Sequence, residues 1–282
     1  MFRLRAKSHK NQRQYVAPMD FLRNQQYFHG RRAKVIYNVM ARKFRDVHDW
    51  RFMNYGYAKE DGSVDAPLFD DEIAEKYPAA LYHLVASQVD VAGKDVLDVG
   101  SGRGGGARYI HRHLGANSTT GMDLSEAVVD FCNQMDAEID GLTFVAGDAL
   151  DMPFDSASVD VVTNVESAHC YPDKNAFLSE VHRVLRPGGH FLITDFSKRG
   201  ESEPLNFSSA GLELVDTNDI TAGVVRALEL DHARKEQRVR QGVPWGFRKL
   251  VMLWAGGKGS WIHSDFADGH RRYVVYNLKK PD

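Results

Sequence analysis

The sequence has few of the features that mark disulfide-rich, membrane-spanning or secreted proteins. It contains only two cysteines among 282 residues, Cys132 and Cys170, so a disulfide framework and a cysteine-based metal site are both excluded. No apolar run approaches the roughly 20 residues needed to cross a bilayer, and the N-terminus lacks the apolar stretch of a signal peptide. We therefore expect a cytoplasmic protein.

Low-complexity tracts and internal repeats are absent as well. Hydrophobic residues make up 43% of the chain and charged residues 26%, which is typical of a globular protein and unlike a disordered tail. This length allows one large domain, or one domain with an appended lid.

Acidic residues are nearly missing from the first 45 positions, where Asp20 stands against twelve Lys and Arg. The rest of the chain holds 24 basic and 37 acidic residues. Such a basic arm suits an anionic partner, which leaves the acidic body of the same protein, a membrane surface or lipid, and nucleic acid as alternatives. Interleaved aromatic residues such as Tyr15 and Phe28 favour a lid. A peripheral membrane contact and a homodimer contact stay open, and no nucleic-acid partner is expected.

We expect two parts, a basic N-terminal helical arm with its linker over residues 1–72 and a larger domain over residues 73–282. The acidic segment Lys59–Glu72 contains glycine and proline and predicts the loop between them. A helical pattern with one buried face follows, from Ile73 to Val85.

Beyond Lys94, short apolar segments alternate with amphipathic helical ones. The predicted strands are Val96–Val99, Thr119–Asp123, Leu142–Ala146, Val159–Val165 and Phe191–Thr194. This alternation predicts an α/β fold, a doubly wound and mostly parallel sheet with helices on both faces.

The C-terminal part departs from this rhythm. A long helical pattern runs from Ile220 to Arg240, and two apolar segments follow it, Phe247–Trp254 and Arg271–Leu278. Two successive strands without a helix between them predict an antiparallel pair at the sheet edge, which brings the sheet to seven strands.

A glycine-rich turn follows the first predicted strand. Gly100, Gly102, Gly104, Gly105 and Gly106 lie within seven positions and lead into a helical segment. In an open α/β sheet this turn lies at the carboxyl edge, where ligands bind, and glycine lets the backbone turn tightly beside a ligand. The spacing also satisfies the dinucleotide fingerprint, so an NAD-dependent oxidoreductase is an alternative.

Three carboxylates lie at the ends of successive strands. Asp98 precedes the glycine turn, Asp123 ends the second strand and Asp148 follows the third. Asp123 can accept hydrogen bonds from both hydroxyls of a ribose, Asp148 can accept one from an adenine amino group, and Asp98 suits a cationic ligand. A dinucleotide explains only Asp123. A ligand that combines an adenosine, a sulfonium and an α-amino group explains all three.

These motifs occur in a recognisable order. The segment VLDVGSGRG over residues 96–104 resembles the first motif of class I S-adenosylmethionine-dependent methyltransferases, and the turns at 147–149 and 184–189 resemble later ones. The segment NVESAHCYP over residues 164–172 resembles, more narrowly, the phthiotriol/phenolphthiodiolone dimycocerosate O-methyltransferases. Those enzymes methylate a hydroxyl on a large lipid. The similarity extends from about Asn54 to the C-terminus, and the basic arm matches poorly.

The resemblance implies a Rossmann-like methyltransferase fold, with residues 73–282 as the S-adenosylmethionine-binding domain. It implies S-adenosyl-L-methionine as cofactor and a small-molecule or lipid-like acceptor, polyketide or phenolic. The residues expected to bind the cofactor are Asp98, Gly100, Ser101, Gly102, Gly104, Asp123, Leu124, Asp148, Ala149, Asn164, Tyr55 and Tyr82.

The chemistry of methyl transfer then asks for a group that takes the acceptor's proton, since the leaving thioether needs none. Glu166 and His169 follow the fourth strand with a spacing that could turn both into the cleft. We predict His169 as general base for a hydroxyl, because an imidazole titrates near neutral pH. Glu166 would orient His169 or hold the acceptor.

Alternatives remain open at this site. Glu166 could cap the turn while His169 packs in the wall. An amine, thiolate or carbon acceptor would make the protein a C-, N- or S-methyltransferase of a small metabolite. No carboxylate cluster marks a metal site at the fourth strand, so we predict no metal.

Overall fold

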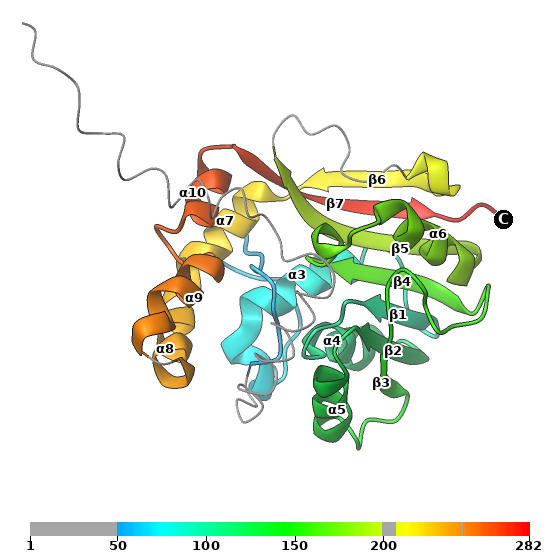
Figure 1. Cartoon of the computed structure of the whole chain (residues 1–282), viewed down its shortest axis with the longest axis horizontal. Helices are drawn as coiled ribbons and strands as arrows, with labels where there is room; N and C mark the ends of the chain where they lie inside the picture. The colour runs from blue at the N-terminus through cyan, green and yellow to red at the C-terminus, as the bar shows by residue number, and fades with distance from the viewer. Residues whose placement is uncertain (1–49, 199–206, 244) are drawn as a thin grey trace, which may run out of the picture.

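The computed structural model describes residues 50–198, 207–243 and 245–282 (Figure 1). The basic arm over residues 1–45 lies outside these ranges, so its role as a lid and the domain boundary at residue 72 stay predictions. Among the residues that are described, no helix is long and apolar enough to cross a membrane.

A seven-stranded sheet forms the centre of the molecule, with strand order β3-β2-β1-β4-β5-β7-β6. The strands are β1 (Asp95–Val99), β2 (Ser118–Asp123), β3 (Leu142–Ala146), β4 (Val159–Val165), β5 (Leu185–Lys198), β6 (Glu213–Asp219) and β7 (Arg271–Lys279). Strands β1 to β5 pair in parallel, whereas β7 runs antiparallel to both β5 and β6. The predicted fold class is confirmed.

Helices surround this sheet, and the last four stand together beside it at the left of Figure 1. The α-helices are α3 (Lys76–Ala86), α4 (Gly105–Leu114), α5 (Glu126–Met135), α6 (Lys174–Val184), α7 (Thr221–Leu230), α8 (His232–Gly242), α9 (Arg248–Trp254) and α10 (Trp261–Ala267). Short 3₁₀ turns are η1 (Asp70–Glu75), η2 (Ala168–Cys170), η3 (Ser208–Ala210) and η4 (Trp245–Phe247).

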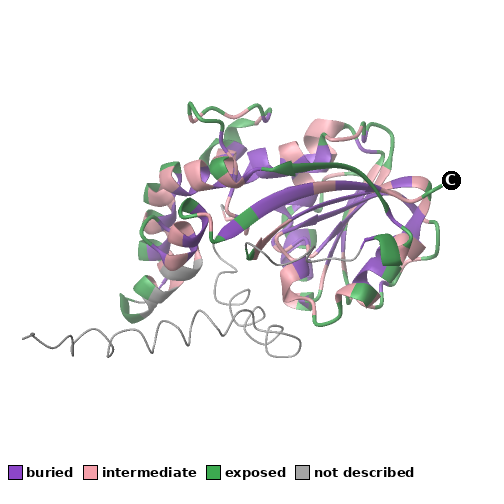
Figure 2. Cartoon of the chain, turned by 90° about the horizontal axis from the view of Figure 1, so that it is seen from above, coloured by how far each residue is buried: buried purple, intermediate pink, exposed green. Residues whose placement is uncertain are grey.

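The central strands are buried on both faces, as Figure 2 shows. Successive residues of a strand point to opposite faces of the sheet, and each face is covered by its own core. Val96 of β1 packs in a core that includes residues of α3, α4, α7 and α10. Its neighbour Leu97 packs in a second core, with α6 and β5. This burial explains why the strands read as nearly continuous apolar runs.

The C-terminal strand pair differs from the prediction in one member. Residues 248–254 form α9, where Val251 and Met252 pack against Val239 and Val243. A short apolar run fits a buried strand and a buried helix equally well, which is why the pattern misled. Besides β5, β7 pairs with β6, which takes the place of the predicted strand at the sheet edge. The residues of β6 are all exposed and include three acids. A polar edge strand gives no apolar signal.

Two helical predictions also need correction. Ile73 was expected on a buried helical face, but it lies in η1 and is 55% exposed, and α3 begins at Lys76. The single helix expected from Ile220 to Arg240 is two helices, α7 and α8, which meet at Asp231.

Gly106 in α4 is required for the packing of two helices that flank the glycine turn. A Cβ atom built at this position would lie 1.9 Å from the Tyr82 ring of α3. Tyr82 is itself buried and cannot move without disturbing its neighbours. Glycine is therefore needed for close approach.

We predict that Gly106→Ala destabilises the protein by about 1–3 kcal/mol through overpacking, even though alanine is the better helix former. Urea unfolding followed by circular dichroism measures the change. The matched control is Gly246→Ala, since a Cβ there meets nothing within 4 Å. An equal effect of the two substitutions would contradict this account of Gly106.

Candidate functional site

The glycine turn connects β1 to α4 at the carboxyl edge of the sheet. Gly100 has a φ of +73°, and a Cβ on it would lie 2.4 Å from the Ser167 hydroxyl. Gly104, with a φ of +79°, is the residue before α4, and a Cβ there would press on the Phe144 ring at 2.7 Å. These two glycines serve the turn and its packing. Their predicted contacts with the cofactor stay predictions.

Asp98 and Tyr82, both predicted to bind cofactor, contact each other. Strand register places Asp98 beside Thr163 of β4. Its carboxylate accepts hydrogen bonds from the Thr163 hydroxyl at 2.8 Å and from the Tyr82 hydroxyl at 3.3 Å. Complete burial raises the pKa of Asp98 to about 7. A cation beside this carboxylate would restore its ionised form.

Asp123 is held at the end of β2 by two backbone groups. Its Oδ2 accepts a hydrogen bond from the Gly102 N–H, and its Oδ1 accepts one from the Ser125 N–H, both at 3.0 Å. Each carboxylate oxygen keeps a further lone pair, so the side chain can accept two ribose hydroxyls. The adjacent Leu124 is exposed, and its predicted contact with the cofactor stays a prediction.

Asp148 and Ala149 form the turn after β3. Asp148 is exposed, and its Oδ1 accepts a hydrogen bond from the Leu150 N–H at 3.0 Å, which fixes the turn. Ala149 is buried in the core that contains α6. The exposed carboxylate is therefore available to an adenine amino group, and Ala149 supports the turn from beneath.

Two buried polar atoms beside the glycine turn fit the expected cofactor. In the described part of the chain, Ser101 Oγ and Asn164 Oδ1 have no hydrogen-bond partner. The Asn164 amide nitrogen donates to Val99 O at 2.9 Å and to Ser167 Oγ at 2.7 Å, so its orientation is fixed. Unpaired buried polar atoms are costly, and a polar ligand would satisfy them.

Glu166 occupies a different position from the one predicted. Its backbone has a φ of +52°, so Glu166 does not lie on a helical turn with His169, as the spacing had suggested. Glu166 Oε1 accepts hydrogen bonds from the Tyr55 N–H at 2.7 Å and from the Tyr273 hydroxyl at 2.6 Å. Burial raises the pKa of Glu166 to about 7. Glu166 thus holds Tyr55 and β7 in place, and its predicted role of holding the acceptor stays a prediction. Another residue contacts the His169 ring.

That residue is Asp195 of β5, which sequence reasoning missed. His169 Nδ1 lies 2.8 Å from Asp195 Oδ1, and the His169 N–H donates to Asp195 Oδ2, also at 2.8 Å. Burial alone would lower the pKa of His169, but the Asp195 carboxylate outweighs it and raises that pKa well above its usual value. The Asp195 contact engages Nδ1, and the role of His169 as general base stays a prediction.

An aromatic wall continues from His169. The Phe196 ring lies 4.7 Å from the His169 ring, and the Tyr55 ring lies 5.8 Å from Phe196 and 6.0 Å from Phe266. Cys170, half-buried, follows His169 directly. Tyr55 therefore joins the ring cluster beside His169, and its predicted contact with the cofactor stays a prediction.

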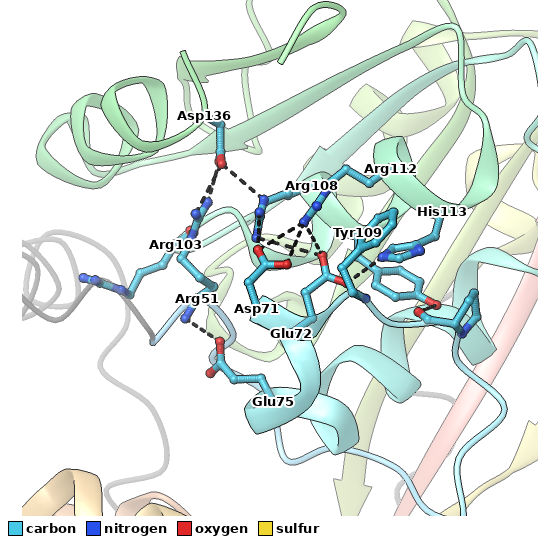
Figure 3. A network of polar contacts seen from close by, with 12 residues as sticks. Arg51, Asp71, Glu72, Glu75, Arg103, Arg108, Tyr109, Arg112, His113 and Asp136 are labelled. Carbon is cyan, nitrogen blue, oxygen red and sulfur yellow. Dashed lines mark hydrogen bonds and ion pairs between the residues drawn. The ribbon is translucent and has the colours of Figure 1, made fainter. Parts of the chain in front are cut away.

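Residues 50–58, here called the strap, contact the glycine turn through Arg51, whose Nε donates to Arg103 O at 3.0 Å. Figure 3 shows Arg51 between Asp136 and Glu75. The Arg51 guanidinium pairs with the Asp136 carboxylate, and its backbone N–H donates to Glu75 at 2.9 Å. The Gly105 N–H, at the start of α4, donates to Arg51 O at 3.2 Å. The strap is thus bound to the cofactor turn itself.

A second set of ion pairs in Figure 3 fixes η1 against α4. Arg108 donates to Asp71 at 2.6 Å, Arg112 donates to Glu72 at 2.8 Å, and His113 Nε2 lies 2.6 Å from Glu72. These contacts hold η1 in place, and none of them involves a residue that was predicted to be catalytic.

Sequence reasoning missed Asp195, Tyr273, Arg51 and Lys235, a buried lysine of α8 that lies near Tyr55. Asp195 had a usable signal, because it is another carboxylate toward the end of a predicted strand. Tyr273 and Lys235 come from distant segments that only the fold brings together. No group of three or more His, Cys, Asp or Glu among the described residues could hold a metal ion, and the absence of a metal stays a prediction.

Comparison with known proteins supports one family. Residues 97–193 match the family model described as a methyltransferase domain. The fatty-acid O-methyltransferase of Mycolicibacterium smegmatis is 37% identical and covers 88% of this chain and 89% of its own length. The phthiotriol/phenolphthiotriol dimycocerosates methyltransferase of Mycobacterium leprae is also 37% identical, with 86% and 90% covered.

Solved structures share the fold at lower identity. The geranyl diphosphate C-methyltransferase of Streptomyces coelicolor A3(2), solved with S-adenosyl-L-homocysteine, has a TM-score of 0.64 at 22% identity and covers 88% of this chain and 96% of its own. The [4+2]-cyclase SpnF has a TM-score of 0.70 at 18% identity, with 90% and 98% covered.

We predict that Asp123→Ala weakens binding of S-adenosyl-L-homocysteine about tenfold to a hundredfold, because two charge-assisted hydrogen bonds to the ribose are lost. Isothermal titration calorimetry measures the dissociation constant. Asp130→Ala, an exposed aspartate on α5, is the control. Unchanged affinity in Asp123→Ala would remove Asp123 from the cofactor site.

The near full-length relatives, the methyltransferase domain model and the sheet topology agree with the residues gathered at the strand ends. The Asp123 carboxylate and the unsatisfied atoms of Ser101 and Asn164 fit S-adenosyl-L-methionine, which is the cofactor of this enzyme. The chain belongs to the class I S-adenosylmethionine-dependent methyltransferases.

Proposed function

We propose that this enzyme transfers a methyl group from S-adenosyl-L-methionine to a hydroxyl of a lipid-like acceptor. The relatives that cover most of the chain are named for fatty-acid and phthiotriol or phenolphthiotriol substrates. The observation that carries the proposal is the His169–Asp195 pair, which lies beside an aromatic wall after β4. An apolar wall next to a basic nitrogen suits a hydroxyl on an apolar molecule.

The protein's own residues then divide the work. Asp123, Ser101 and Asn164 hold the cofactor, which supplies an electrophilic methyl group. The Phe196 and Tyr55 rings exclude water and align the acceptor chain. His169 Nε2 removes the hydroxyl proton as the oxygen attacks, and the Asp195 carboxylate stabilises the imidazolium that forms.

A lipid-like acceptor also bears on where in the cell we propose that the enzyme acts. A cytoplasmic enzyme that takes a lipid acceptor benefits from a peripheral membrane contact, and the basic arm over residues 1–45 is our candidate for it. A homodimer contact through the arm is the alternative. Neither involves nucleic acid.

We predict that His169→Ala lowers kcat about a hundredfold to ten-thousandfold, the usual contribution of a general base. The wild-type rate should rise with pH through the elevated pKa of His169, because only the neutral imidazole accepts a proton. In Asp195→Asn the pKa-raising carboxylate is gone, so the rise should move to lower pH while the plateau rate falls.

Initial rates with a long-chain alcohol, a phenolic lipid and an amine, measured from pH 6 to pH 10, test this proposal. His182→Ala is the control, since His182 lies on α6, whose apolar residues pack in the core that contains Leu97. Turnover of the amine with no response to His169→Ala would instead show an N-methyltransferase. Methylation of none of the three would refute the proposed substrate class.

A further inference from the structure

Lys235 is a buried cation that the methyl-transfer scheme above does not use. It lies on α8 with only 9% of its surface exposed, and its Nζ is 5.9 Å from the centre of the Tyr55 ring. Burial is the main influence on this amine and lowers the pKa of Lys235 to about 8. A lysine therefore faces the same aromatic ring that lines the acceptor side of the site.

The ammonium group of Lys235 is poorly compensated. Among the described residues it makes one hydrogen bond, to Ala255 O at 3.3 Å, although it has three N–H donors. Asp231 Oδ2 lies 4.0 Å away, but Arg234 donates to both oxygens of that carboxylate. The Glu166 carboxylate also attracts the Lys235 ammonium group, but no ion pair joins these two side chains within the described part of the chain, and Glu166 Oε1 accepts from Tyr55 and Tyr273. A buried cation in this state favours an anionic ligand.

The position of Lys235 relative to the wall defines which part of the acceptor it meets. The wall runs from His169 to Phe196 and on to Tyr55, and Lys235 lies next to Tyr55 at its far end. An acceptor that lies along the wall with its hydroxyl at His169 brings a more distant group to Lys235. An apolar chain between the two polar ends matches the rings between them.

We propose that Lys235 binds an anionic oxygen group of the acceptor, such as a carboxylate, and so selects acidic lipids over neutral ones. This inference rests on the proposed function, whose substrate class it narrows. The carboxylate is remote from the methylated hydroxyl, as in a hydroxylated fatty acid.

The test compares 12-hydroxyoctadecanoic acid with its primary amide, which keeps the chain and hydroxyl but carries no charge. In Lys235→Met we expect the KM for the acid to rise about tenfold to a hundredfold and the KM for the amide to change less than twofold. Lys235→Arg should restore much of the preference for the acid. Arg240→Met, an exposed cation of the same helix, is the control.

Binding of both compounds to the enzyme saturated with S-adenosyl-L-homocysteine, measured by calorimetry, separates this inference from the proposed function. The inference is supported if the wild type binds the acid more tightly than the amide and Lys235→Met does not. This holds even if neither compound is methylated. Mass spectrometry of any product then distinguishes an ether, as expected when the carboxylate is remote, from a methyl ester, which would contradict a carboxylate held at Lys235. Equal binding of acid and amide by the wild type would overturn the inference. So would weaker S-adenosyl-L-homocysteine binding by Lys235→Met with acid binding unchanged.

Discussion

The Glu166 carboxylate is the constraint on which the acceptor side of this enzyme depends. A carboxylate withdrawn from water must be hydrogen-bonded, and the half-buried Glu166 receives its donors from two distant segments, the Tyr55 N–H of the strap and the Tyr273 hydroxyl of β7. Its left-handed backbone makes this reach possible at the end of β4. The strap, the C-terminal strand and the loop after β4 are therefore fixed relative to one another by one side chain.

The two halves of the site are held by different physical means. On the cofactor side, backbone groups dominate, because glycines bring the chain close and the Asp123 carboxylate is fixed by N–H donors. On the acceptor side, side chains from separate strands and helices converge, and Asp195 adjusts the basicity of His169. The strap joins these halves, since Arg51 binds the glycine turn at one end and Tyr55 binds Glu166 at the other.

Much of the fold could be predicted from the sequence because the parallel strands are buried on both faces and therefore strongly apolar. The same rule failed for β6, which is exposed along its whole length, and for α9, whose apolar run is too short to reveal its period. The places of Asp98 and Asp123 near strand ends could be predicted because apolar strands and the turns that follow them are visible in the sequence. Tyr273 contacts Glu166 across more than a hundred residues of chain, and Lys235 lies near Tyr55 across about 180. No local sequence pattern encodes such contacts.

The two cysteines differ sharply in their surroundings. Cys132 is fully buried behind the glycine turn, and burial raises the pKa of its thiol to about 12, so it stays protonated and inert. Cys170 is half-buried, beside His169. A maleimide fluorophore would consequently attach at a single position next to the imidazole that we propose as general base, and the natural sequence already offers an optical reporter for that region.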